Sequence, residues 1–198
     1  HIGCTSFFPS KNLGCYGDGG AIFTNDDALA QRMRVVGNHG MGTRYYHDSV
    51  GVNSRLDSIQ AAILRIKLRH LDQYAEARQK AANYYDQVFK DHPGLEIPDR
   101  SSFSTHVFHQ YTLKTKGIDR FALQKYLGEK EIPAMVYYPV PMHMQKAYDD
   151  PRYKKGDFPV SEALSESVIS LPMHTELDEE QLKHICTSVL EGMEACRV

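Results

Sequence analysis

One lysine in a short turn is the residue of this sequence best suited to covalent chemistry. Lys11 lies between Pro9, which opens a turn after a strand expected to end at Phe8, and Gly14, with the next strand expected from Gly20. A lysine whose stem is held on both sides can be partly desolvated, which favours its neutral, nucleophilic amine. The position therefore suits a Schiff base with a carbonyl compound. Lysines near turns serve solubility more often, so the pattern alone favours a solvated lysine over a catalytic one.

Other clusters of chemically capable residues favour structural roles. Residues 17–20, Gly-Asp-Gly-Gly, lack the Gly-Lys-Ser/Thr ending of a phosphate-binding P-loop and indicate a turn. His106 and His109 would point to opposite faces of an expected strand, so they are not expected to share a metal ion. The four cysteines contain no Cys-x-x-Cys pair and indicate neither a zinc site nor a disulfide framework.

The composition limits the classes of function. The 198 residues carry a formal net charge of −2 without a basic cluster, so a surface that binds nucleic acid is not expected. No apolar run approaches the length of a membrane span, and the sequence predicts a cytoplasmic protein. The length allows one large hydrophobic core or two small ones.

Local patterns predict the elements that hold the Lys11 turn. Residues 2–8 and 20–25 are expected to form two strands of one sheet that helices cover on both faces. Asn25 and Asp26 should cap a helix that ends at Gly37, and a glycine-rich loop should follow that helix.

A long helix is predicted for the centre of the chain. Its pattern begins at residues 53–57, runs to about residue 90 with apolar positions on two sides, and stops at residues 92–94, His-Pro-Gly. Such a helix bridges two domains or a subunit interface more often than it lies on a surface.

After residue 93 the pattern changes to the short strands and helices of a smaller α+β domain. The expected strands are residues 107–114 and 132–138, and the expected helices begin at Asp119 and cover residues 142–148, 161–168 and 178–196. We therefore expect three parts, namely residues 1–55, a connecting helix over residues 56–92, and a C-terminal domain over residues 93–198.

The residues around Lys11 also resemble a known segment. Ser-Phe-Phe-Pro-Ser-Lys-Asn-Leu-Gly at residues 6–14, followed by Gly-Asp-Gly-Gly-Ala-Ile at residues 17–22, resembles the cofactor-lysine segment of the DegT/StrS family of nucleotide-sugar aminotransferases. These are fold-type-I enzymes that use pyridoxal phosphate (PLP). The resemblance implies that Lys11 forms the Schiff base with PLP and that Ser6 binds the cofactor phosphate.

The same resemblance implies an α/β fold that begins inside a domain. Residues 1–55 would form the C-terminal part of the large PLP-binding domain, a central sheet with helices, and a smaller α+β domain would follow. The opening residues 1–5, His-Ile-Gly-Cys-Thr, fit the middle of a domain, so the chain resembles the C-terminal half of such an enzyme. The aromatic residue that stacks on PLP and the aspartate that pairs with its pyridine nitrogen would precede it. We therefore expect the fragment alone to be inactive.

Two further stretches gain a role from the resemblance. Residues 53–57, Asn-Ser-Arg-Leu-Asp, by themselves indicate a helix N-terminus. In the family, Asn53 would cross the interface of a homodimer to the PLP phosphate of the other subunit, and Arg55 would contact an anionic group. Residues 137–143, Tyr-Tyr-Pro-Val-Pro-Met-His, resemble a segment that borders the sugar-nucleotide pocket, which makes Tyr138 and His143 candidates for substrate binding.

The expected function is PLP-dependent transamination of a nucleotide-linked keto-sugar, with glutamate as amino donor, in amino-sugar biosynthesis for polysaccharides or related glycans. The Asn-Ser-Arg-Leu-Asp form of residues 53–57 resembles relatives that aminate the 3-position, so a 3-keto sugar is favoured. Two alternatives stay open. One is an aminotransferase of a non-nucleotide substrate such as a keto-inositol or an aminobenzoate precursor, and the other is a structural half without activity of its own.

Overall fold

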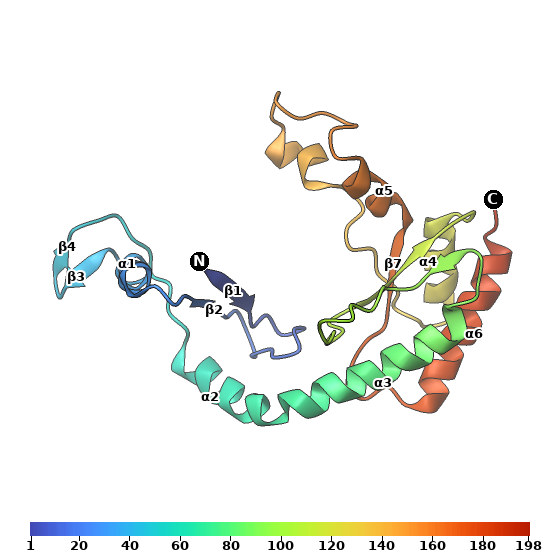
Figure 1. Ribbon diagram of the computed structural model, residues 1–198, viewed down its shortest axis with the longest axis horizontal. Coiled ribbons are helices and arrows are strands. Elements are labelled where there is room, and N and C mark those ends of the chain that lie inside the picture. Colours follow the sequence, from blue (N-terminus) through green and yellow to red (C-terminus); the bar gives the residue numbers. More distant parts are fainter. The chain divides into compact units, whose positions relative to one another are not determined.

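The computed structural model describes residues 1–198 and divides into two units, residues 1–73 and residues 74–198 (Figure 1). In the first unit, strands β1 (Gly3–Ser6) and β2 (Gly20–Phe23) pair antiparallel, with Ser6 opposite Gly20. This pairing confirms that the strands on either side of Lys11 belong to one sheet. It also brings together the two ends of the loop that contains Lys11.

Helix α1 (Asp27–Gly37) follows β2 with the predicted boundaries. The Asp26 carboxylate accepts a hydrogen bond from the Leu29 N–H at 3.0 Å, which caps the helix. Beyond α1 the sequence predicts a loop, but the structure contains a short antiparallel hairpin of β3 (Met41–Thr43) and β4 (Tyr46–His47). Tyr45 makes the turn between these strands with a φ of 71°, a left-handed conformation that is uncommon for tyrosine.

The long helical segment starts later than predicted. It consists of α2 (Ser58–Lys67), the 3₁₀ turn η1 (Leu68–His70) and α3 (Leu71–Phe89), which follow one another directly. Residues 53–56 stay outside the helix because their backbone pairs with the residues that end α1. Asn53 forms an antiparallel bridge with Asn38, and the Ser54 N–H donates to the Gly37 carbonyl at 2.9 Å. The predicted end near residue 90 is confirmed.

The second unit is a three-stranded antiparallel sheet packed against helices (Figure 1). The strand order is β5 (Leu95–Glu96), β6 (Tyr111–Thr115) and β7 (Val168–Leu171). Helices α4 (Arg120–Glu129) and α6 (Glu179–Ala195) pack on each other, and α5 (Pro159–Ser167) leads into β7. The core is formed by large apolar side chains from α3, the sheet, α4, α6 and the segment before β6, which include Tyr85, Phe89, Phe108, Tyr111, Leu113, Leu123, Leu127, Ile169 and Val189.

The strand predicted over residues 107–114 is wrong in its first half, since β6 begins only at Tyr111. Phe108 has a φ of 42°, which takes the chain out of the extended conformation. The carbonyl oxygens of Phe108 and His109 instead accept hydrogen bonds from Nη1 of the buried Arg78, at 3.0 and 3.2 Å. A buried guanidinium therefore replaces the strand partner that these two carbonyl groups lack.

The strand predicted over residues 132–138 is reduced to one bridge between Met135 and Ser170 of β7. Pro133 has no N–H to donate, and the N–H of Ala134 is used in a local hydrogen bond. A regular ladder cannot form from these residues.

The region before α6 differs from the prediction in two places. The helix predicted over residues 142–148 is two 3₁₀ turns, η2 (Met142–Met144) and η3 (Lys146–Tyr148), because Gln145 between them is extended. The helix predicted over residues 161–168 ends at Ser167, and β7 follows as a strand that the sequence analysis did not predict. All four residues of β7 are buried, so they lack the alternation that marks a half-exposed strand.

The C-terminal helix α6 is confirmed. Its start is fixed by a capping box, in which the Asp178 carboxylate accepts from the Gln181 N–H at 2.8 Å and the Gln181 side chain accepts from the Asp178 N–H. None of the helices combines the length and the apolar character that a membrane crossing requires.

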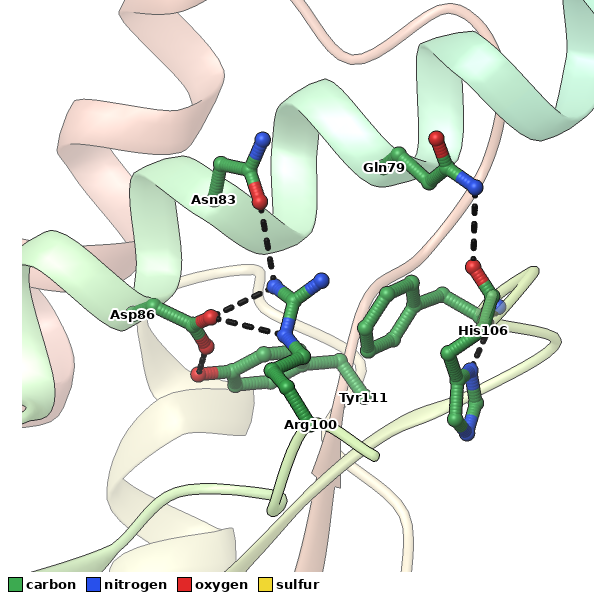
Figure 2. A network of polar contacts seen from close by, with 7 residues as sticks. Gln79, Asn83, Asp86, Arg100, His106 and Tyr111 are labelled. Atoms are coloured by element: carbon green, nitrogen blue, oxygen red, sulfur yellow. Dashed lines mark hydrogen bonds and ion pairs between the residues drawn. The ribbon is translucent and has the colours of Figure 1, made fainter. Parts of the chain in front are cut away.

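A polar network fixes the segment before β6 to α3 (Figure 2). The Arg100 guanidinium donates to the Asp86 carboxylate, with Nε 3.0 Å from Oδ2, and to Asn83 Oδ1 at 3.1 Å. The Tyr111 hydroxyl donates to the other Asp86 oxygen at 2.7 Å. Asp86 therefore joins the irregular segment and the first residue of β6 to one turn of α3.

Candidate active site

The Lys11 loop, defined as residues 7–19, connects β1 to β2 and is closed at its base by backbone hydrogen bonds. The Phe7 N–H donates to the Gly19 carbonyl at 2.8 Å, and the Cys15 N–H donates to the Phe7 carbonyl at 2.8 Å. Within the loop, the Lys11 N–H donates to the Phe8 carbonyl at 2.9 Å and forms the predicted tight turn. The partly buried Lys11 is thus carried by a backbone that is fixed at both ends.

Ser6, the last residue of β1, lies where the Lys11 loop begins. Its hydroxyl oxygen accepts a hydrogen bond from the Phe8 N–H at 3.2 Å, and Phe8 in turn accepts from Lys11. The structure therefore brings these two predicted site residues into one hydrogen-bonded turn. The hydroxyl hydrogen of the exposed Ser6 can be donated to an anion.

Cys15 fills the centre of the loop. The side chain is fully buried, and Sγ lies 3.0 Å from the carbonyl oxygens of both Phe7 and Gly17, so its single hydrogen is shared between them. A side chain on Gly19 would collide with this sulfur, because its first carbon would lie 2.9 Å from Sγ. The thiol is therefore a packing and bonding element of the loop.

Helix α2 contacts the Lys11 loop through two side chains that the sequence analysis missed. The Tyr16 N–H donates to Gln60 Oε1 at 2.8 Å, and Lys67 Nζ donates to the Gly14 carbonyl at 2.5 Å. The available signal was the spacing of seven between Gln60 and Lys67, which places both side chains on one helical face.

Replacing Gly14 by alanine is expected to lower kcat of the intact protein about 100-fold, because misplacing a reacting group by about 1 Å has an effect of that size. A methyl group on Gly14 would lie 2.4 Å from the Pro9 carbonyl oxygen and 2.8 Å from the Phe8 carbonyl oxygen, and the latter accepts the Lys11 hydrogen bond. The turn must shift to relieve this contact.

Gly128→Ala is the control for this experiment. Nothing lies within 4 Å of the position that a methyl group on Gly128 would take, and Gly128 is an exposed residue of α4. Steady-state kinetics and thermal melting of both variants check the prediction. Equal activity of Gly14→Ala and Gly128→Ala would show that the turn tolerates the displacement.

Asn53 and Arg55 lie in the extended segment before α2 and contact each other. Arg55 Nε donates to Asn53 Oδ1 at 3.1 Å, and both side chains are exposed. Arg55 also lines an open pocket of about 800 Å³ together with Arg34 of α1. Two arginines are therefore among the residues that line this pocket, and their positive charge suits an anionic ligand. Arg34 was not a candidate in the sequence analysis.

Tyr138 and His143 belong to the second unit and differ in their surroundings. The His143 side chain is 8% exposed, and its Nε2 lies 2.9 Å from Glu162 Oε1. The Gly156 N–H, 2.8 Å from the same oxygen, is the main cause that holds the pKa of Glu162 below its usual range, with a smaller contribution from His143. Tyr138 is 72% exposed. His143 is therefore held in a fixed position, whereas the Tyr138 ring is open to solvent.

Comparison with known proteins assigns a family to this arrangement. The model of the DegT/DnrJ/EryC1/StrS aminotransferase family matches residues 1–190. The chain belongs to this family. This confirms the resemblance that the residues around Lys11 indicated.

Two curated DegT/DnrJ/EryC1/StrS relatives share 45% identity with the chain over 188 residues. The match to the pleiotropic regulatory protein of Geobacillus stearothermophilus covers 94% of this chain and 50% of that protein. The match to UDP-2-acetamido-2-deoxy-3-oxo-D-glucuronate aminotransferase of Pseudomonas aeruginosa covers 95% and 51%. The chain thus spans about half the length of the curated relatives it matches.

Solved structures agree with the family assignment. The structure of DesV from S. venezuelae in complex with a ketimine intermediate has a TM-score of 0.92 and 38% identity, over 100% of this chain and 52% of that chain. The structure of ntda from Bacillus subtilis with bound cofactor PMP has a TM-score of 0.87 and 26% identity, over 98% of this chain and 46% of that chain. These neighbours confirm the α/β fold expected from the sequence.

The residues of the Lys11 loop fit a PLP cofactor as far as this chain supplies contacts. Lys11 offers the amine that a Schiff base with the PLP aldehyde needs. The Ser6 hydroxyl, joined to the same turn, offers a donor for the phosphate. Lys11 and Ser6 therefore offer partners for two functional groups of PLP, the aldehyde and the phosphate.

Proposed function

We propose that the protein to which these residues belong is a PLP-dependent aminotransferase of a nucleotide-linked 3-keto sugar, with glutamate as amino donor, in amino-sugar biosynthesis for glycans. The observation that carries this proposal is the hydrogen-bonded turn that joins Ser6, at the end of β1, to Lys11, because it holds a hydroxyl and an amine on one fixed stretch of backbone. The 45% identical Pseudomonas aeruginosa relative is named for a 3-oxo sugar nucleotide, which supports the choice of the 3-position.

Lys11 is the catalytic residue of this proposal. When bound, PLP supplies the electron sink that stabilises negative charge at the carbon bearing the amino group. Lys11 Nζ would hold the cofactor through its aldehyde in the resting protein. As a free amine, Nζ would accept the proton from the substrate Cα and donate it again.

The other candidate residues bind groups that do not react. Ser6 and Asn53 are proposed to donate hydrogen bonds to the cofactor phosphate. Arg55 is proposed to bind an anionic group of the substrate, and the pocket that it shares with Arg34 supports this role because a nucleotide diphosphate carries at least two negative charges. Tyr138 and His143 are proposed to border the sugar-nucleotide pocket.

The proposed assembly is a homodimer with shared sites. Asn53 would serve the PLP phosphate of the other subunit, while Lys11 and Ser6 serve their own. We also propose residues 1–55 as part of the large domain, residues 56–92 as its connecting helix and residues 93–198 as the small domain.

The substrate class is tested with paired keto-sugar nucleotides. Matched 3-keto and 4-keto sugars, each linked to UDP and to dTDP, are supplied to the intact protein with glutamate, and 2-oxoglutarate is measured. We expect kcat/KM to favour the 3-keto compound by at least about tenfold, because a site that hydrogen-bonds sugar hydroxyls rejects misplaced ones. Preference for the 4-keto compound, or for a keto-inositol included in the panel, contradicts the proposed substrate.

A further inference from the structure

Two polar side chains of α2 hold the second half of the Lys11 loop. Lys67 Nζ donates to the Gly14 carbonyl at 2.5 Å and lies 5.1 Å from the centre of the Tyr16 ring. Gln60 Oε1 accepts the Tyr16 N–H at 2.8 Å. Gln60 and Lys67 thus bind three groups of two loop residues, namely the Gly14 carbonyl and the ring and N–H of Tyr16.

Helix α2 can hold the loop in one position because the helix itself is fixed by packing on its buried face. Gln60, Leu64 and Lys67 follow at spacings of four and three, so they lie on one helical face. Leu64 is buried between the two polar residues, and Lys67 is partly buried. The two polar contacts are therefore made from the face of α2 that packs against the rest of the first unit, and not from a face that points to solvent.

The turn at Lys11 is held by its own backbone bond to Phe8, and the bonds of Phe7 and Cys15 close the loop base. Any movement of Gly14 reaches this turn, since the Gly14 α-carbon faces the carbonyl oxygens of Pro9 and Phe8 without room for a methyl group. The contacts of α2 with Gly14 and Tyr16 consequently limit where Lys11 can lie.

We propose that Gln60 and Lys67 are positioning residues that fix the Lys11 loop and thereby place the Lys11 amine for its reaction. The inference rests on the proposed function of Lys11. The same helix begins directly after the segment of Asn53 and Arg55, so it ties the position of that segment to the position of the loop.

The test compares four variants of the intact, PLP-loaded protein. Lys67→Met removes the charge and keeps the length of the side chain, Lys67→Arg keeps a cationic donor, and Gln60→Leu removes the acceptor. The matched control is Arg65→Met, which removes a positive charge from an exposed position of the same helix. Hydrogen exchange of the peptide over residues 8–17 is measured by mass spectrometry, together with kcat and KM.

We expect Lys67→Met and Gln60→Leu to speed exchange of the Lys11, Cys15 and Tyr16 amides about tenfold, since each removes a hydrogen bond that opposes local opening. We expect kcat to fall about tenfold or more with little change in KM, because the displaced group acts in the chemical step. Lys67→Arg should restore most of both properties, and Arg65→Met should match the unaltered protein.

Unchanged exchange in Lys67→Met and Gln60→Leu overturns the inference, whatever happens to activity. Faster exchange with an unaltered kcat also overturns it, because the loop would then move without consequence for the reaction. The proposed function is tested separately, by determining whether the unaltered protein carries PLP on Lys11. A protein without PLP on Lys11 refutes that function, while the exchange comparison still decides whether α2 holds the loop.

Discussion

Lys11→Ala is expected to lower the transamination rate of the intact protein by at least about 10⁴-fold, because proton transfer by a positioned side chain alone contributes up to about that factor. The variant is also expected to lose the covalent attachment that Lys11 is proposed to give the cofactor. Neither loss can be replaced by another residue of the Lys11 loop, which contains no other lysine. The rate is measured in single turnovers with PLP in excess, so that weaker cofactor binding does not determine the result.

Lys125→Ala is the control for Lys11→Ala, since Lys125 is an exposed lysine on α4 whose ion pair with Glu129 spans 4.0 Å. Borohydride reduction supplies a second measurement. It should fix the cofactor permanently to the peptide that contains Lys11 in the unaltered protein and in Lys125→Ala, and not in Lys11→Ala. Labelling of a different lysine would assign the Schiff base elsewhere and refute the role of Lys11.

The Lys11 loop could be predicted from the sequence because local residues determine it. Pro9 restricts the backbone where the turn begins, and Gly14 is required where the chain passes close to two carbonyl groups. The start of α1 at Asp26 and the start of α6 at Asp178 were predicted for the same reason, since a capping carboxylate binds N–H groups two or three residues away.

Features that depend on distant residues were not predictable in this way. The extended conformation before Tyr111 is lost because Arg78, thirty or more positions earlier in the chain, binds the carbonyls of Phe108 and His109. Strand β7 (Val168–Leu171) is fully buried, so it shows no alternation of apolar and polar residues. Both features result from tertiary packing, to which local patterns are insensitive.

The contacts of the candidate site also differ in whether they join residues that are near or distant in the sequence. Ser6 and Lys11 are joined through one local turn, so the motif that identified them also predicts that they lie together. Gln60 and Lys67 contact the loop across forty-four and fifty-three positions of sequence. Their spacing of seven indicates only that they share a helical face, and it does not indicate what that face contacts. The pairing of His143 with Glu162 was missed for the same reason.

Mixed dimers of Lys11→Ala and Asn53→Ala subunits are expected to regain activity that neither parent has. If Lys11 and Asn53 of different subunits serve one PLP, a mixed dimer contains one site with both substitutions and one site with neither. Random reassociation makes about half of the dimers mixed, so the recovered activity should approach roughly a quarter of that of the unaltered protein, as the two-fold symmetry of such an interface requires.

The structure supplies the reason to choose Asn53 for this experiment. Its segment is exposed and is held in an extended form by the bridge to Asn38, and the Arg55 guanidinium fixes its side-chain oxygen, which leaves the amide N–H₂ group to donate to a phosphate. The comparison is informative only if Asn53→Ala alone clearly lowers the activity. A nearly fully active Asn53→Ala protein would already refute its phosphate role.

The formation of mixed dimers is verified independently by placing different affinity tags on the two subunits and purifying over both. Lys11→Ala mixed with Lys125→Ala, Asn53→Ala subunits serves as a control for effects of the tags and of reassociation, because Lys125 lies outside the candidate site and the expected gain is unchanged. Activity that stays at the level of the parents in doubly purified dimers means that Lys11 and Asn53 act within one subunit. In that case one subunit would supply both Lys11 and Asn53 to each site. Helix α2 would then connect two parts of the same site and not parts of two different sites.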